Sequence, residues 1–231
     1  MFVDAIQRAK ASIFPIIATL TKNGRYAGSQ VAGTGFFIDD IGHFVTALHV
    51  VSGDPNVVKY GSLGNIPNAT FKNAQPEAIK EVGRNPELDL YVGKLEINLQ
   101  APLRLASHNP PLGTSIVIGG YPFPNIQKKP NGSLEFYTVR QYWQSTMIMD
   151  YLHMGNFNPI LRYNGFLVDK RTIPGMSGGP VLNVAGEIVG LCTAQITRAA
   201  KDRVPNINGV CLDAKSLAAG VQHILDEHAK N

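Results

Sequence analysis

Cysteine is scarce in this sequence. Only two cysteines occur among 231 residues, Cys192 and Cys211, which is too few for a small secreted scaffold held together by disulfide bonds. A free cysteine usually behaves as a small buried apolar residue, and two cysteines can also form one disulfide. The sequence leaves both alternatives open, but it excludes a disulfide-dense fold.

Long apolar segments are also missing. No run approaches the ~18 apolar residues that a membrane-spanning helix needs, so we expect no membrane span. Residues 1–10 carry charge and residues 11–20 are largely apolar, an order that loosely imitates a signal peptide. However, Asp4 lies in the charged part, Pro15 interrupts the apolar part, and no A-x-A cleavage site follows. We therefore expect a cytoplasmic protein, with a non-standard export route as the alternative, and we interpret residues 12–21 as a first strand.

Strongly basic runs are absent as well. The net charge is +4 and the sequence pI is about 9.0, but no run of five or more Lys or Arg occurs, so we predict no nucleic-acid partner. The histidines lack a ligand-like spacing to Cys, Asp or Glu, and we predict no metal site. Hydrophobic residues make up 44 % of the chain, which is enough for a sizeable core and argues against disorder.

Short strand-like segments dominate the chain. They are separated by turn signals, among them residues 52–55, 130–132 and 184–186. Regularly spaced short strands indicate barrels or a sandwich rather than alternating strands and helices. The segments that we expect to form strands are residues 31–38, 43–47, 88–95, 115–119, 134–148 and 187–193.

One helix is expected, near the end of the chain. Asp213 can cap a helix over residues 214–229. The side chains that share its apolar face are Leu217, Val221, Ile224 and Leu225. Residues 101–113 have the composition of a connection, so we expect an N-terminal lobe over residues 1–112 and a C-terminal lobe over residues 113–231.

The most informative segment is residues 174–180, Pro-Gly-Met-Ser-Gly-Gly-Pro. Glycines on both sides of Ser177 let the backbone turn sharply and approach a ligand. The amides of Gly175 and Ser177 can together form an oxyanion hole, in which one donor is worth about 3 to 4 kcal/mol. The alternative is a Gly-rich turn with a structural role only.

A serine hydroxyl is a weak nucleophile and needs a base that a third group orients. His49 follows the apolar segment 43–47 where a turn begins, which makes it the candidate base. Asp89 lies in an apolar segment, where a carboxylate is costly unless it is hydrogen-bonded, and it is the candidate partner of His49. Glu87 is the alternative acid, because alternation along a strand would place it on the same side as Asp89.

A second enzyme class matches the same serine. Residues 175–179 also fit the Gly-x-Ser-x-Gly nucleophile elbow of α/β-hydrolases, and Ser177, Asp213 and His223 occur in the order which that fold requires. An elbow opens a helix, however, whereas Pro180 and the residues after it look like a strand. We therefore do not favour this interpretation.

Taken together, the motifs resemble the chymotrypsin-like serine proteases, and most of all the HtrA-type branch. The matching segments, in the family's order, are residues 33–38 (Gly-Thr-Gly-Phe-Phe-Ile), 46–50 (Thr-Ala-Leu-His-Val), 89–91 (Asp-Leu-Tyr), 113–123, 174–180 and 190–194. The resemblance covers residues 12–213 and implies an all-β fold of two six-stranded antiparallel β-barrels with a C-terminal α-helix. It also implies a serine endopeptidase that cleaves protein or peptide substrates through an acyl-enzyme without a cofactor. HtrA-type enzymes are often trimers, so a homo-oligomer is a further expectation.

The resemblance also implies where a substrate binds. The walls of the specificity pocket should come from residues 171–174, 193–195 and 209–211, and Cys192 and Cys211 should lie on adjacent strands near it. The backbone at Thr193 and Ala194 should pair with an extended substrate. The substrate-binding residues implied in this way are Arg171, Thr172, Thr193, Ala194 and Gln195.

Two departures from the family pattern matter. Met176 stands where an Asp or Asn usually precedes the nucleophile, so we expect no activation through an ion pair with a new N-terminus. The sequence leaves no room after residue 231 for the PDZ module typical of HtrA proteins, and we expect none. Because a protease fold can persist after activity is lost, a catalytically inactive peptide-binding or scaffold protein is the alternative function.

Overall fold

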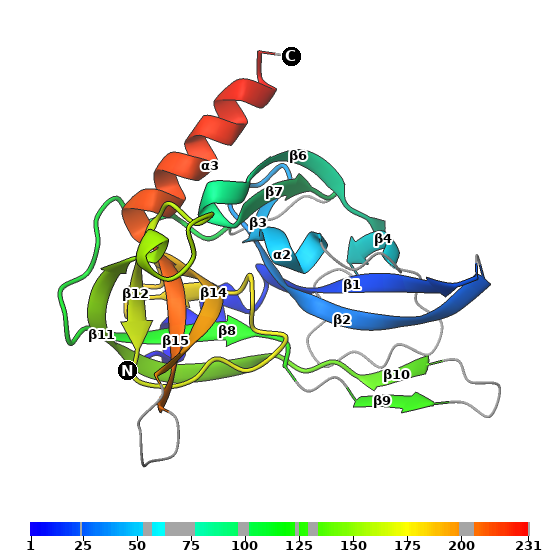
Figure 1. Cartoon of the computed structure of the whole chain (residues 1–231), viewed down its shortest axis with the longest axis horizontal. Helices are drawn as coiled ribbons and strands as arrows, with labels where there is room; N and C mark the ends of the chain where they lie inside the picture. The colour runs from blue at the N-terminus through cyan, green and yellow to red at the C-terminus, as the bar shows by residue number, and fades with distance from the viewer. Residues whose placement is uncertain are drawn as a thin grey trace.

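The computed structural model describes residues 1–23, 25–52, 57–62, 77–96, 102–122, 125–128, 134–198 and 206–230. Antiparallel strands form a seven-stranded sheet, a closed six-stranded barrel and a separate two-stranded hairpin (Figure 1). The predicted turn at residues 130–132 lies outside the described residues, as does the turn predicted at residues 52–55 except for its first residue, whereas the turn at residues 184–186 is present.

The seven-stranded sheet has the strand order β5-β4-β1-β2-β3-β7-β6. Its strands are β1 (Ile13–Lys22), β2 (Arg25–Phe37), β3 (His43–Ala47), β4 (Val57–Ser62), β5 (Glu77–Ala78), β6 (Lys80–Asn85) and β7 (Leu90–Lys94). β5 and β6 pair at opposite edges although only Ile79 separates them in the chain. The sheet therefore curls until its two edges come together at that residue, but no strand pairing closes it among the described residues.

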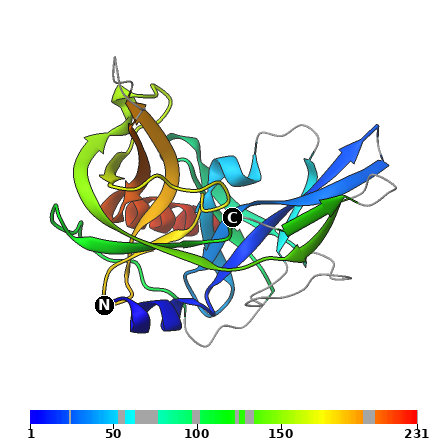
Figure 2. The same ribbon diagram turned by 90° about the horizontal axis from the view of Figure 1, so that it is seen from below.

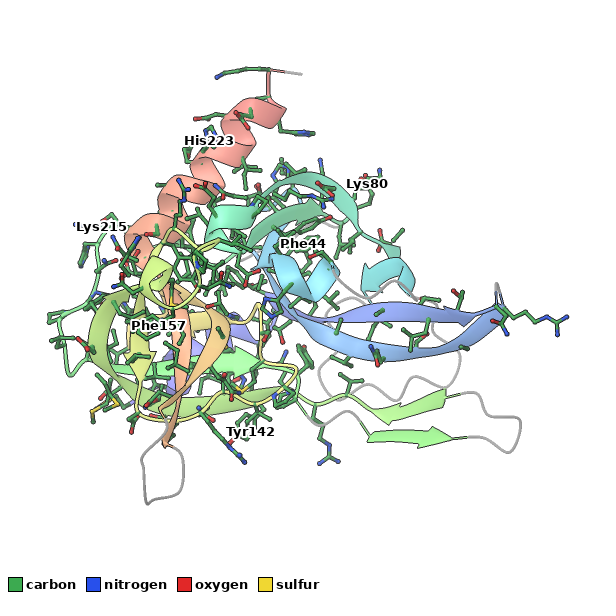
Figure 3. The ribbon with its side chains drawn as sticks, in the orientation of Figure 1. Phe44, Lys80, Tyr142, Phe157, Lys215 and His223 are labelled. Carbon is green, nitrogen blue, oxygen red and sulfur yellow. The ribbon has the colours of Figure 1, made fainter. Side chains whose placement is uncertain are left out.

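Aromatic side chains fill the inside of this sheet. Phe14 of β1 packs against Phe37 and Phe44, with ring centroids 4.6 and 5.1 Å from its own, and all three side chains are fully buried (Phe44 is labelled in Figure 3). A Cβ atom on Gly35 would lie only 2.7 Å from the Phe14 ring. The glycine within β2 thus makes the space that the ring occupies.

The barrel has the closed order β11-β12-β15-β14-β13-β8. Its strands are β8 (Ser115–Gly120), β11 (Tyr142–His153), β12 (Asn164–Val168), β13 (Pro180–Leu182), β14 (Ile188–Arg198) and β15 (Asn206–Asp213), and the hairpin consists of β9 (Asn125–Lys128) and β10 (Leu134–Thr138). Figures 1 and 2 show the barrel beside the seven-stranded sheet, with the hairpin extending along β1 and β2. The prediction of two six-stranded barrels is therefore corrected. One barrel of six strands is closed, whereas the other sheet has seven strands, and no pairing among the described residues closes it.

Most predicted strands are present, and the departures have local causes. Residues 43–47 form β3, and the first strand begins at Ile13, one residue later than predicted. The segment 134–148 divides into β10, which pairs with β9, and β11, which pairs with β8. The segment 88–95 loses its first two residues because Pro86 opens a short 3₁₀ helix, η1 (Pro86–Leu88).

Helix α1 (Val3–Ala9) was not predicted. Its buried side chains are only Ala5 and Ala9, which are too small to mark an apolar face in the sequence. Among the described residues, none of the helices combines the length and the apolar character needed to cross a membrane.

The predicted C-terminal helix is confirmed as α3 (Ala214–His228). The Asp213 carboxylate caps it by accepting a hydrogen bond of 2.8 Å from the Ser216 amide. Asn109 Nδ2 donates to the other oxygen of that carboxylate (2.8 Å), and Asn109 Oδ1 accepts from the Lys215 amide (3.1 Å). The chain between the two sheets is thus fastened to the start of the helix.

Helix α3 joins the two sheets. It continues from β15 of the barrel and packs on β6 and β7 (Figure 1). Leu217, Val221 and Ile224 are buried in this contact, as the predicted apolar face requires, whereas Leu225 is half-buried. Lys215 and His223 are exposed (Figure 3).

We predict that Ile224→Ala lowers the free energy of unfolding by about 2 to 5 kcal/mol, the usual cost of deleting a buried aliphatic side chain. Ile224 lies directly over Gly83 of β6, where a Cβ atom would meet its Cγ2 at 2.7 Å. Urea denaturation measures the loss. The control is Gln222→Ala on the exposed face, which should change stability by about 0.5 kcal/mol at most; equal losses in both variants would contradict the packing described.

Candidate active site

His49 and Asp89 are joined by two hydrogen bonds. The Asp89 carboxylate accepts from the backbone amide of His49 (3.0 Å) through Oδ1 and contacts His49 Nδ1 (2.7 Å) through Oδ2. A carboxylate only accepts hydrogen bonds, so His49 Nδ1 is the donor in this contact, and a neutral His49 ring then carries its lone pair on Nε2. The His49 side chain is 47 % exposed and that of Asp89 is 15 % exposed, so the ring is accessible while its partner is largely covered.

The local fold positions both residues. His49 lies in α2 (Leu48–Val51), a single turn that begins where β3 ends. Asp89 follows η1 and adopts a left-handed conformation with φ +50°, which Asp tolerates better than most residues. Its carbonyl accepts from the Leu48 amide (2.8 Å), one of the unpaired amides at the start of a helix. Asp89 therefore holds the first turn of α2 by its backbone and by its side chain.

The expected position of Asp89 within a strand is corrected, because it lies one residue before β7. Glu87, the alternative acid, does not approach His49. Its exposed carboxylate lies 3.6 Å from Arg162 Nε, and its carbonyl accepts from the Arg162 amide (2.8 Å). The left-handed turn at Asp89 breaks the alternation on which the Glu87 alternative rested.

The segment before Ser177 forms a tight turn. The Met176 amide donates to the Ile173 carbonyl (2.9 Å), and Gly175 has φ +95°. Pro at the second position and a positive φ at the third define a type II turn, whereas a type I turn would need a negative φ at Gly175. Within the described part of the chain, the amides of Gly175 and Ser177 donate no hydrogen bond.

The residues after Ser177 allow a close approach of backbones. A Cβ atom on Gly178 would lie 2.1 Å from Thr46 Oγ1 and 2.3 Å from the Thr34 carbonyl, and Gly178 has φ +81°. A Cβ atom on Gly179 would lie 2.0 Å from the Gly119 carbonyl. Any side chain at these positions would push the serine loop away from β2, β3 and β8, so the two glycines are needed for the fit.

Ser177 lies next to the element that carries His49. A Cβ atom on Gly33 would stand 2.7 Å from the Ser177 carbonyl and equally close to the Val50 side chain of α2. Among the described residues, no hydrogen bond joins the Ser177 hydroxyl to the His49 ring. Such hydrogen bonds are often long without a substrate and tighten when one binds.

The α/β-hydrolase alternative is wrong. Ser177 is followed by strand β13 and not by a helix. Asp213 caps α3, and His223 is an exposed residue of that helix beside Glu227. These residues are therefore engaged away from the serine loop.

Met176 anchors the serine loop in the barrel interior. Its side chain is fully buried among apolar residues of the barrel, which include Ile116, Ile118, Val181 and Cys192. The residue before Ser177 is thus held by burial of apolar surface and not by an ion pair.

The three segments that were expected to wall a pocket lie together. The Gly209 amide donates to the Lys170 carbonyl (3.0 Å), the Gln195 side-chain amide donates to the Thr172 carbonyl, and Thr172 Oγ1 donates to the Ala194 carbonyl (3.4 Å). A Cβ atom on Gly209 would lie 2.7 Å from Thr172 Cγ2, so the Thr172 methyl group fills the space above that glycine.

Two other expected binding residues have different surroundings. The Thr193 hydroxyl is buried and lies 2.9 Å from the Tyr163 hydroxyl and 3.3 Å from the Val210 carbonyl, so only the backbone of Thr193 is available to a ligand. The Arg171 side chain is exposed, and its carbonyl accepts from Gln144 (3.0 Å).

The two cysteines are free thiols. Cys192 of β14 and Cys211 of β15 lie directly opposite each other, as the resemblance implied, and both are buried. Burial raises the pKa of the Cys211 thiol, and its hydrogen bond with Cys192 raises it further. Of the two alternatives left open by the sequence, the structure has the pair of small buried side chains.

A family model described as a trypsin-like peptidase domain matches residues 33–191, a span that contains His49, Asp89 and Ser177. The chain belongs to the trypsin-like peptidase family. Among the curated relatives of this trypsin-like peptidase is the probable periplasmic serine endoprotease DegP-like of Chlamydia trachomatis, which is 29 % identical over 168 residues, covering 72 % of this chain and 29 % of the relative. The protein of the same name from Pseudomonas fulva is 27 % identical over 177 residues, covering 76 % and 31 %. This peptidase domain thus spans about a third of the length of the curated relatives it matches.

The fold of this trypsin-like peptidase also has solved neighbours. The structure of the HtrA-type protease AlgW with a tripeptide has a TM-score of 0.70 and 20 % identity, over 98 % of this chain and 64 % of that one. Together with the DegP-like relatives, this neighbour confirms the predicted resemblance to HtrA-type proteases.

The expected cytoplasmic location is wrong. The finding against it is that the relatives from both organisms are named as periplasmic proteins. The expectation came from the composition of residues 1–20. Those residues form α1 and most of β1 in the structure, so their composition reflects packing in the fold.

Three residues that surround the site were not singled out from the sequence. Asn85 accepts from the Leu88 amide (3.1 Å) and shapes η1 before Asp89. Tyr163 contacts Thr193, and burial raises the pKa of Tyr163 while the Asp89 charge adds to the shift, so the phenol stays neutral. Thr34 contacts the serine loop directly. Only Thr34 had a signal, because it lies within the family segment at residues 33–38.

We predict that Met176→Ala lowers the free energy of unfolding by about 2 to 5 kcal/mol because it leaves a cavity in the barrel. Met176→Leu conserves volume and should cost less than about 1.5 kcal/mol. Chemical denaturation of both variants beside the wild type measures the difference. If Met176→Ala unfolds at the wild-type midpoint, Met176 is not the anchor described.

Proposed function

We propose that this chain is a serine endopeptidase with Ser177 as nucleophile, His49 as general base and Asp89 as the residue that orients it. The observation that carries the proposal is the Asp89 carboxylate on His49 Nδ1, beside a serine loop in a type II turn. Only with the proton on Nδ1 can the Nε2 lone pair accept a proton from a serine hydroxyl.

The proposed reaction runs in two halves. His49 Nε2 takes the proton of the Ser177 hydroxyl while Oγ bonds to the carbonyl carbon of the scissile peptide. The amides of Gly175 and Ser177 donate to the resulting oxyanion. The C–N bond then breaks, the leaving amine takes the proton from His49, and an acyl-enzyme remains. Water repeats the sequence through the same base, releases the acid and restores Ser177.

The exposed edge of β14 supports binding of an extended peptide. β13 pairs with β14 only as far as Leu191, and no described strand occupies that edge from Thr193 to Ile196. An extended peptide can add there as a further strand, with the backbone of Thr193, Ala194 and Gln195 as its partners. Thr172 and Arg171 would border the first side-chain pocket. The fold neighbour AlgW, which was solved with a tripeptide, supports a peptide substrate.

We predict that wild-type protein exposed to a fluorophosphonate gains the mass of one adduct, because the probe reacts with activated serines, and that Ser177→Ala gains none. Intact-mass spectrometry measures both, and casein cleavage by the same samples should follow the labelling. An unlabelled, correctly folded wild type would favour the inactive peptide-binding alternative. An adduct that persists in Ser177→Ala would place the nucleophile elsewhere.

We predict that Asp89→Asn lowers kcat by about 10⁴-fold, because the amide no longer fixes the His49 tautomer. Glu87→Gln is the matched control, since it makes the same chemical change two residues away on a carboxylate that faces Arg162, and it should leave kcat unchanged. Casein cleavage at saturating substrate measures both. A large effect of Glu87→Gln together with a small effect of Asp89→Asn would transfer the orienting role to Glu87.

A further inference from the structure

Thr34 of β2 is fully buried, and all of its polar groups are engaged. Its hydroxyl donates to the Gly175 carbonyl (2.7 Å) and accepts from the Tyr121 amide (3.0 Å). Its amide donates to the Ser177 carbonyl (2.9 Å), and its carbonyl accepts from the Thr46 hydroxyl (2.7 Å). Two of these four hydrogen bonds end on the serine loop.

The strand pairing explains why Thr34 is free to make them. In β2 it lies opposite Pro15 of β1. Its amide donates to the Ser177 carbonyl and its carbonyl accepts from Thr46, so both groups point away from β1, as in a non-hydrogen-bonded pair of an antiparallel sheet. The pairing of β2 with β3 ends at Phe36, opposite Val45, two residues after Thr34. At Thr34 the serine loop and the Thr46 hydroxyl therefore supply the hydrogen-bond partners that a neighbouring strand would supply.

The two bonds bracket the amide of Ser177. This amide belongs to the peptide unit between Met176 and Ser177, and Thr34 holds the carbonyl on each side of that unit. The bond from Thr34 to the Gly175 carbonyl holds the peptide unit that follows Gly175, in the second half of the type II turn, where φ at Gly175 is +95°. Neither amide is held directly, but each belongs to a peptide unit next to one whose carbonyl Thr34 holds.

We propose that Thr34 is a positioning residue for the oxyanion hole, holding the Gly175 and Ser177 amides in their direction from the seven-stranded sheet while the serine loop belongs to the barrel. The inference rests on the proposed function. In this role Thr34 does not contact the substrate. Loss of the Thr34 hydroxyl should therefore slow the chemical step without changing the affinity of the initial complex with the reagent.

The test is the rate of fluorophosphonate labelling of the full chain, measured at several reagent concentrations. The data give kinact, the maximal rate constant of labelling, and KI, the reagent concentration at which half of that rate is reached. Thr34→Val removes the hydroxyl and keeps the branched shape, and it should lower kinact by about 10- to 100-fold, less than the loss of about 10²–10³ expected for removing an oxyanion donor itself. KI should not change, because the reagent's first contact with the surface does not use the loop carbonyls. Thr34→Ser keeps the hydroxyl and should restore most of kinact.

Tyr121→Phe is the matched control. The Tyr121 hydroxyl is also buried and also makes two hydrogen bonds, to the Ile13 carbonyl (3.0 Å) and from Gln141 (2.8 Å), but it does not touch the serine loop. It should cost stability as Thr34→Val does while leaving kinact unchanged. Thermal unfolding of each variant separates stability from rate.

The outcomes are distinct. If the wild type is labelled and Thr34→Val is labelled at the same rate, or if Thr34→Ser is as slow as Thr34→Val, the positioning role is refuted and the proposed function stands. If the wild type is not labelled at all, the proposed function fails first. Should Thr34→Val not fold, because a methyl group presses on the Gly175 carbonyl, Thr34→Ala replaces it, and the same comparison with Thr34→Ser decides.

Discussion

The close approach of two backbones, one from each sheet, is the constraint on which the site depends. His49 and Asp89 belong to the seven-stranded sheet, whereas Ser177 belongs to a loop of the barrel. Their side chains can act together only if the serine loop lies directly on β2 and β3 with no side chain between. Gly33 and Gly178 provide this, since a Cβ atom on either would come within 3 Å of the backbone of the other half.

The serine loop is held from two sides by different forces. From the sheet, Thr34 holds the carbonyls of Gly175 and Ser177 by hydrogen bonds. From the barrel, the Met176 side chain is buried in an apolar cluster. The hydrogen bonds set the direction of the loop's backbone groups, and the buried side chain of Met176 sets how deeply the loop lies against the barrel. The departure from the family pattern at Met176 therefore exchanges one kind of anchor for another and does not remove the anchor.

The sequence contained enough to predict most of the local features. The glycines around Ser177, the capping Asp213 and the strand before His49 each depend on residues close together in the chain. The position of Asp89 was harder, because a left-handed residue after a Pro86-initiated turn leaves the same alternating pattern as a strand. The role of Thr34 was not predictable in this way, since its hydroxyl bonds reach across 141 and 87 residues. Whether a sheet closes into a barrel likewise depends on which strands, far apart in the sequence, pair with each other at its edges.

The hydrogen bonds of Thr34 also bear on how the molecule unfolds. Neither sheet alone offers partners for the Gly175 and Ser177 carbonyls or for the Thr34 hydroxyl, and a buried polar group left without a partner costs about 1–3 kcal/mol. Helix α3 adds apolar contacts between the same two sheets. Separation of the halves would therefore destabilise both of them at once, so we expect denaturation to be a single cooperative transition in which the surroundings of His49 and Ser177 lose their order together.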